Sequence, residues 1–156
     1  MQTLEPTACR HTTIRIATDR PTQFIDITGH IQAFVSASGI HAGFVNVQTR
    51  HTTAAIVVNE HEPLLLDDFA SLLERTAPRH EAYAHDDPER RTANLEPDER
   101  ANGHAHCRAL FLSPSAFLNV VGSAIQLGRW QRVFFVELDG PRARELSIVA
   151  FGEARR

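Results

Sequence analysis

Three potential metal ligands lie side by side in the stretch ANGHAHCRA, namely His104, His106 and Cys107. Imidazole nitrogen and thiolate sulfur are the ligands that zinc prefers in proteins. On an extended chain the two histidines would point to the same side, whereas on a helix they would diverge by about 200°. The Asn-Gly pair in front favours a turn or an extended segment, followed by a helix that begins at Cys107. We interpret the histidines as candidate ligands and Cys107 as a small buried side chain.

A second candidate cluster lies in RHTTAAIVVNE, which runs from Arg50 to Glu60. His51 falls between two predicted strands, next to small residues that would let the backbone approach a ligand closely. Asn59 and Glu60 lie at the far end of the second strand. A hairpin with a surface histidine is the simpler interpretation of the same pattern, and the stretch alone favours it.

A third candidate lies in the polar stretch YAHDDPERRTAN, within a charged segment from 79 to about 101 that lacks apolar periodicity. Its His85, Asp86 and Asp87 could ligate a metal, or the carboxylates could orient an imidazole ligand. A loop of this length is typical of either a functional loop or a disordered one, and the stretch alone favours a solvated, mobile loop.

The last candidate segment, QLGRWQRVFFVELDGPRARE, combines the only tryptophan with several arginines. An arginine presents a planar fork of donors to phosphate or carboxylate, which makes Arg129, Arg142 and Arg144 candidate anion binders. Trp130 stands at a predicted strand start, where a single tryptophan is usually part of the core.

The elements that must position these residues alternate between strand-like and helix-like periodicity. Two helices are predicted, one that begins near Thr28 and ends at Gly39 and one over 62–78 with Pro63 in its first turn, besides the short one from Cys107 to Leu112. Strand patterns cover 11–19, 24–27, 43–50, 53–60, 116–121, 123–128, 132–140 and 144–152. This order predicts a single α+β domain of mostly antiparallel sheet over residues 1–156.

Composition narrows the function classes. The chain has 156 residues and a net charge of -3, which argues against general nucleic-acid binding. All 16 basic residues are arginine, so no lysine can form a Schiff base or act as a base. We expect no membrane span and no secretory signal. With two distant cysteines, a reduced cytoplasm is the expected location.

Taken together and in this order, the motifs resemble the YjbQ-like family, often named for secondary thiamine-phosphate synthase activity. The resemblance covers the chain from about residue 10 onward. It rests on HTTAAIVVNE (51–60), the acidic helix around Asp67 and Asp68, YAHDD (83–87), NGHAH (102–106), SAFLNVVGSAIQLGRWQ (115–131) and ELDGPRARELSIVAFGE (137–153). Arg129, Asn119, Ser123 and Cys107 depart from the family's usual residues, which bears on the shape of the pocket and the substrate.

The resemblance implies a sandwich-like α+β fold, a homotrimer and a pocket where histidines hold a divalent metal. Matching positions assign metal binding to His51, His85 and His106, with His104 as a companion, and place Asn59, Glu60 and Asn102 beside them. Zinc suits such nitrogen ligands, whereas magnesium would accompany a diphosphate substrate. The implied reaction joins a pyrimidine diphosphate to a thiazole phosphate and releases pyrophosphate. In this scheme Glu60 or Asp86 is the base, and Arg50 or Arg129 binds phosphate.

Two alternatives remain open from the sequence. A metal held by three histidines has an open position for water, which would suit a metallohydrolase of another substrate. The histidines could instead stabilise a trimeric protein that binds a metal or small molecule without catalysis.

Overall fold

The computed structural model describes residues 6–154, which form a single α+β domain with two antiparallel sheets. The five-stranded sheet has the order β1-β8-β3-β5-β6, and the three-stranded sheet has the order β2-β7-β4. The strands of the first are β1 (Thr7–Ala17), β8 (Ala143–Ala154), β3 (Ile40–Thr49), β5 (Ser115–Val121) and β6 (Ala124–Ile125). Those of the second are β2 (Gln23–Asp26), β7 (Gln131–Glu137) and β4 (Ala54–Glu60). The predicted fold class is confirmed.

The two faces of the three-stranded sheet pack into separate apolar clusters. One face meets the five-stranded sheet and α1 (Thr28–Ser38), in a cluster that includes Ile31, Val45 and Phe135. The other face packs against α2 (Pro63–Thr76) and α3 (Gly103–Ala109), in a cluster that includes Phe134 and Ala105. Since β7 is covered on both sides, its residues from Val133 onward are buried.

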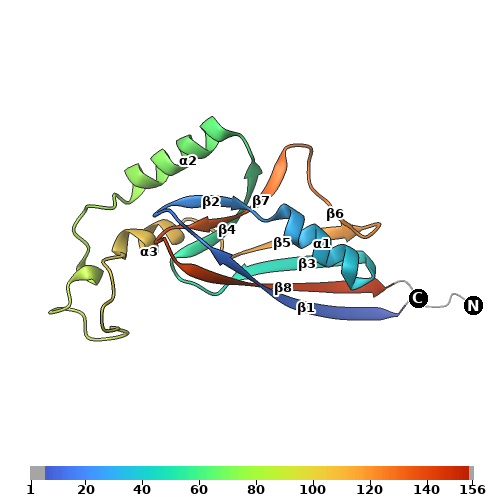
Figure 1. Cartoon of the computed structure of the whole chain (residues 1–156), viewed down its shortest axis with the longest axis horizontal. Helices are drawn as coiled ribbons and strands as arrows, with labels where there is room; N and C mark the ends of the chain where they lie inside the picture. The colour runs from blue at the N-terminus through green and yellow to red at the C-terminus, as the bar shows by residue number, and fades with distance from the viewer. Residues whose placement is uncertain (1–5, 155–156) are drawn as a thin grey trace, which may run out of the picture.

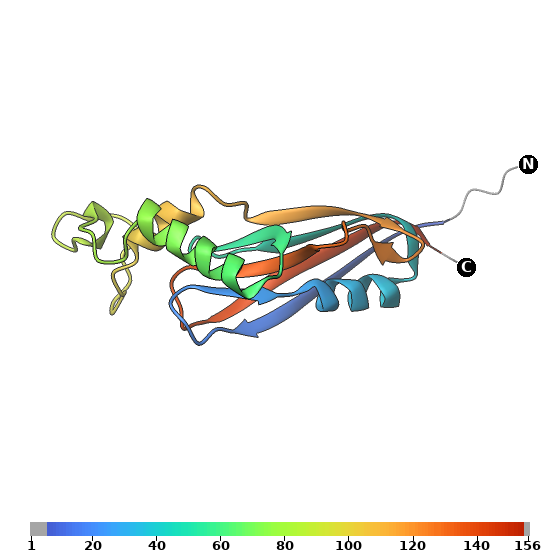
Figure 2. The same cartoon turned by 90° about the horizontal axis from the view of Figure 1, so that it is seen from above.

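Figures 1 and 2 show a molecule longer than it is wide, with α2 lying across the three-stranded sheet. The segment between α2 and α3 contains one short 3-10 helix, η1 (Ala84–Asp86). In both views this segment extends beyond the sheets at the end of the molecule opposite α1. Across residues 6–154, the structure contains no helix long and apolar enough to cross a membrane.

Two helix starts differ from the prediction. Ile27 rather than Thr28 occupies the N-cap position of α1, and the Thr28 hydroxyl instead accepts a hydrogen bond from the Val133 amide at 2.8 Å. The helix predicted from Cys107 begins earlier, at Gly103, and ends at Ala109. His104 and His106 therefore lie on a helix and diverge, and Cys107 is exposed rather than buried.

Two other expectations are wrong because of how the strands are shared between the sheets. β3 and β4 do not form a hairpin, since they belong to different sheets. Trp130 is not a core residue, because it lies in the connection before β7 with 60% of its surface exposed. The Arg129 guanidinium stacks over its ring, 4.5 Å from the ring centroid.

Candidate functional site

The imidazoles of His85 and His106 face each other at the end of the molecule formed by the 79–101 segment. Their ring centroids lie 4.6 Å apart with an interplanar angle of 64°. His85 comes from η1 and His106 from α3, so the pair joins the long segment to the second sheet's outer layer. Both rings line a cavity of about 590 Å³ together with Thr52, Arg91, Thr92, Ala93, Asn94 and Glu99. That volume lies within the range of ordinary small-molecule sites.

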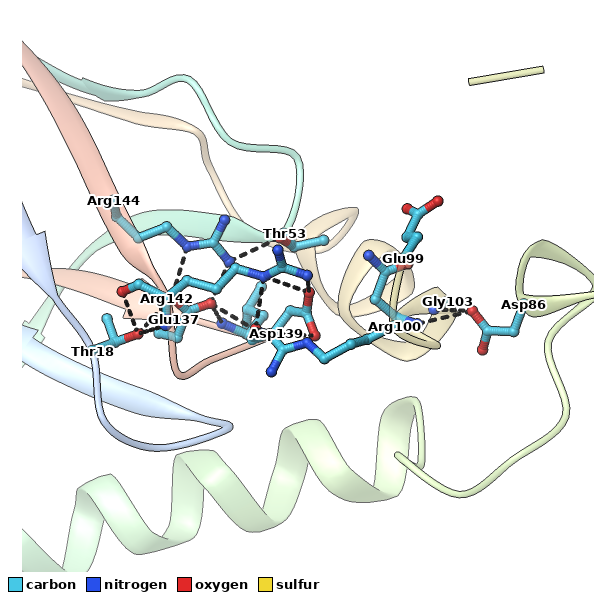
Figure 3. A network of polar contacts seen from close by, with 12 residues as sticks. Thr18, Thr53, Asp86, Glu99, Arg100, Gly103, Glu137, Asp139, Arg142 and Arg144 are labelled. Carbon is cyan, nitrogen blue, oxygen red and sulfur yellow. Dashed lines mark hydrogen bonds and ion pairs between the residues drawn. The ribbon is translucent and has the colours of Figure 1, made fainter. Parts of the chain in front are cut away.

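Asp86 holds η1 against the beginning of α3. Its Oδ1 accepts hydrogen bonds from the amides of Asn102 (2.9 Å) and Gly103 (2.8 Å), as Figure 3 shows for Gly103. A Cβ on Gly103 would lie 2.5 Å from Cβ of Tyr83, so only glycine allows this close contact. The cap and the glycine together fix how His85 meets His106.

The His106 ring favours its neutral form. Burial lowers the pKa of His106, and the adjacent His85 lowers it further, while the charges of Glu99 and Asp139 oppose this shift. A neutral imidazole keeps a nitrogen lone pair, which a metal or a proton donor requires.

The charged side chains of the cavity are paired with each other. Arg91 donates a hydrogen bond to Glu99 at 2.6 Å and also binds the carbonyls of Ala93 and Asn94. Burial raises the pKa of Glu99, but the hydrogen bond and charge of Arg91 outweigh this effect and lower the pKa overall. Arg91 and Glu99 thus link the parts of the loop that line the cavity.

His104 lies on a different side of α3 and is almost fully buried, at 1% exposure. Burial lowers the pKa of His104, with the charges of Arg108 and Arg79 contributing in the same direction. Within residues 6–154, the buried side-chain polar atoms that lack a hydrogen-bond partner are Arg79 Nη1, His85 Nε2, Asn102 Oδ1, His104 Nε2 and Asp139 Oδ1. These atoms belong to the 79–101 segment, to α3 with its N-cap residue, and to the β7–β8 connection. Because buried polar groups are normally satisfied, their concentration marks this end of the molecule as a candidate site.

His51 is engaged in a backbone contact. Its Nε2 accepts a hydrogen bond from the Glu145 amide at 3.0 Å, at the start of β8. Burial and the positive charge of Arg144 lower the pKa of His51, which is consistent with an unprotonated Nε2. The residue that reaches the cavity from this segment is Thr52.

Other predicted site residues lie away from the cavity. Asn59 and Glu60 are exposed at the opposite end of β4 from Thr52, and a strand of that length spans about 20 Å. Arg50 forms an ion pair with Glu145 at 2.9 Å. Arg129 stacks on Trp130 in the connection that precedes β7. The structure therefore brings together His85, His106, Asp86 and Asn102. It does not bring to them the four residues just described, which are Arg50, Asn59, Glu60 and Arg129.

The donor set fits a metal in part. Two adjacent imidazoles suit zinc or a similar transition metal. Zinc needs three or four protein ligands, however, and the part of the chain from 6 to 154 contains no group of three or more His, Cys, Asp or Glu side chains arranged to hold an ion. His85 and His106 are thus the adjacent pair of imidazoles that could ligate a metal at this cavity.

The comparison with known proteins agrees with the motifs. A model of the family described as UPF0047 protein YjbQ-like matches residues 12–153. The chain belongs to this family. A UPF0047 protein of Methanothermobacter thermautotrophicus is 37% identical over 138 residues, covering 88% of this chain and 89% of the relative. UPF0047 protein YugU of Bacillus subtilis is 30% identical over 142 residues, covering 90% of this chain and 98% of the relative.

Solved structures of YjbQ-like proteins share the fold. A YbjQ-like protein of unknown function from Sulfolobus solfataricus superposes with a TM-score of 0.84 at 31% identity, covering 95% of this chain and 100% of that one. A hypothetical protein from Aeropyrum pernix gives a TM-score of 0.81 at 32% identity, covering 92% and 99%. These similarities establish the family and the fold and do not by themselves assign a reaction.

Some polar residues around the YjbQ-like site were missed by sequence reasoning. Glu137 and Asp139 are 0% and 1% exposed; Glu137 forms a buried ion pair with Arg144, and Asp139 pairs with the partly exposed Arg142. The sequence carried a signal, because Glu137 directly follows the apolar run VFFV and Asp139 lies two residues further on. A carboxylate that is buried with such a run needs a cation to pair with it, and the arginines that follow supply one. Arg142 and Arg144, two of the three arginines considered as anion binders, are therefore paired with carboxylates of the same chain.

Proposed function

We propose that the protein is a metal-dependent enzyme of the secondary thiamine-phosphate synthase type. It acts on a phosphorylated small molecule in the cavity beside His85 and His106. The observation that carries this proposal is the unpartnered, buried Nε2 of His85 next to a neutral His106 in a cavity of ligand size. The family resemblance supplies the specific reaction, in which a thiazole nitrogen bonds to the pyrimidine methylene carbon and the carbon–oxygen bond to pyrophosphate breaks.

The residues of the cavity have distinct parts in this proposal. His85 and His106 would hold a divalent ion, with zinc preferred for nitrogen ligands and magnesium as the alternative with a diphosphate. When bound, the ion supplies positive charge that stabilises the departing pyrophosphate. Arg91 is the cavity's cation and would bind a phosphate group by exchanging its contact with Glu99 for one with the ligand.

The proposal also includes a cytoplasmic homotrimer. Two imidazoles leave a zinc ion short of ligands, so the substrate or a neighbouring subunit would supply the remainder. Large apolar side chains exposed at the end of α3, Leu110 and Phe111, provide surface for such a neighbour.

Metal analysis and a product assay test the proposal together. Purified wild-type protein, loaded with zinc or magnesium, is expected to form thiamine phosphate from the two phosphorylated precursors. His106→Ala and His85→Ala should each weaken metal binding by about 100-fold or more and abolish product. His30→Ala removes an exposed histidine elsewhere and serves as the matched control. Metal-loaded wild-type protein that makes no thiamine phosphate would contradict the proposed reaction.

A further inference from the structure

A buried ion pair joins the end of β7 to the beginning of β8. Arg144 donates from Nε to Glu137 Oε2 at 2.7 Å and from Nη2 to Glu137 Oε1 at 2.5 Å. Both side chains are almost inaccessible, with 5% exposure for the arginine and none for the glutamate. Figure 3 shows the pair within a wider network of polar contacts that approaches α3.

The carboxylate of Glu137 is fully satisfied by its surroundings. Its Oε1 also accepts from the amides of Leu138 (3.0 Å) and Asp139 (2.8 Å), and its Oε2 accepts from the Thr18 hydroxyl at 3.0 Å. Burial raises the pKa of Glu137, but these hydrogen bonds and Arg144 outweigh it and lower the pKa overall. A buried pair of this kind adds little net stability, yet removing one partner is costly. Its value therefore lies in the geometry that it imposes.

That geometry reaches the wall of the candidate site through Thr53. Arg144 Nη2 donates to the Thr53 hydroxyl at 3.0 Å, and the Leu138 amide donates to the Thr53 carbonyl at 3.2 Å. The preceding residue, Thr52, lines the cavity with His85 and His106. One residue earlier, His51 accepts the Glu145 amide. The two residues that flank Thr52 are thus tied to the ends of β7 and β8.

We propose that Glu137 and Arg144 are positioning residues of the site. Their ion pair holds Thr53, and thereby sets Thr52 against the His85–His106 pair without either charged group touching a ligand. The inference rests on the proposed function in taking this cavity as the site. It assigns a role that the arginine-rich motif did not suggest, because Arg144 is not among the residues that line the cavity and binds Glu137 and Thr53 instead.

Two threonine variants at opposite sides of the same ion pair test this inference. Thr53→Val removes the acceptor on the site side, and Thr18→Val removes the hydroxyl on the other side, with the same loss of one hydroxyl. We expect Thr53→Val alone to shift the ring-nitrogen NMR signals of His85 and His106 and to weaken zinc binding about tenfold. Thr18→Val should leave both ring signals in place, and Thr53→Ser, which keeps the hydroxyl, should restore the wild-type spectrum.

The ring signals separate this inference from the proposed function. They report the positions of the imidazoles even if the wild-type protein binds no zinc and makes no thiamine phosphate. Equal shifts in Thr53→Val and Thr18→Val, or none in Thr53→Val, would show a general structural role and overturn the inference. If Thr53→Val does not fold, Arg144→Lys with the same spectra replaces it, since lysine keeps the charge but loses the two-pronged contact.

Discussion

At the scale of single residues, the structure separates histidines that the sequence grouped together. The spacing of His104 and His106 allowed a shared direction only on an extended chain, and their position on α3 makes them diverge. His106 meets His85 instead, while His104 is buried on its own. Residue types thus predicted that these histidines could bind a metal or take part in chemistry. The directions of their side chains depend on the start of α3 at Gly103, which the local sequence pattern did not reveal.

The structural role of His51 predicts a pH dependence of stability. Burial, followed by the charge of Arg144, lowers the pKa of His51 in the folded protein below its ordinary value of 6.5. The unfolded chain therefore binds the proton more readily, so the contribution of His51 to stability is complete above pH 6.5 and is lost as pH falls through the folded pKa. Glutamine at this position can accept the Glu145 amide and does not titrate.

We accordingly expect His51→Gln to flatten the fall in the free energy of unfolding between about pH 7 and pH 5. Urea unfolding followed by circular dichroism at a series of pH values measures this slope. His30→Gln, at an exposed position, controls for the removal of one histidine. If the free energy of unfolding of His51→Gln falls with pH as steeply as that of the wild type, protonation of His51 does not compete with its hydrogen bond to the Glu145 amide.

At the scale of elements, the sequence predicted helices best where their signals are local. The apolar spacing and Pro63 located α2 closely, because both act within the helix. The start of α3 was missed because its cap is not local. The side chain of Asn102, the N-cap residue, makes no capping hydrogen bond. The amides of Asn102 and Gly103 instead donate to the carboxylate of Asp86, which lies much earlier in the chain.

The N-terminus of α2 offers a test of capping in this protein. The Glu62 carboxylate accepts hydrogen bonds from the amides of Leu64 (3.0 Å) and Leu65 (2.8 Å). Glu62→Ala leaves these amides without their acceptor and should lower stability by about 1 kcal/mol. Glu62→Asn places a good capping residue at the same position and should retain most of the stability. Thermal unfolding compares the three proteins, and equal midpoints for Glu62→Ala and wild type would contradict the assignment.

At the scale of the whole molecule, strand patterns and turn residues were enough to predict an α+β domain of mostly antiparallel sheet, and the family resemblance added the sandwich-like arrangement. They were not enough to predict which strands share a sheet. β3 and β4 belong to different sheets; Thr52, in the connection between them, lines the cavity, whereas Glu60 lies at the far end of β4. Pairing between distant strands is decided by side-chain packing across the core, which no local pattern encodes.

The outer face of the five-stranded sheet carries the strongest argument for assembly. Phe44 lies 4.6 Å from Phe117 and 5.5 Å from Phe151, measured between ring centroids, and Phe117 is 63% exposed. A contiguous aromatic surface of this kind is typical of an interface. Under the proposed homotrimer, light scattering should give three times the chain mass of 17.4 kDa. Phe117→Asp would place a charge in the contact and should shift the mass toward a single chain, whereas an unchanged trimer would show that the subunits meet elsewhere.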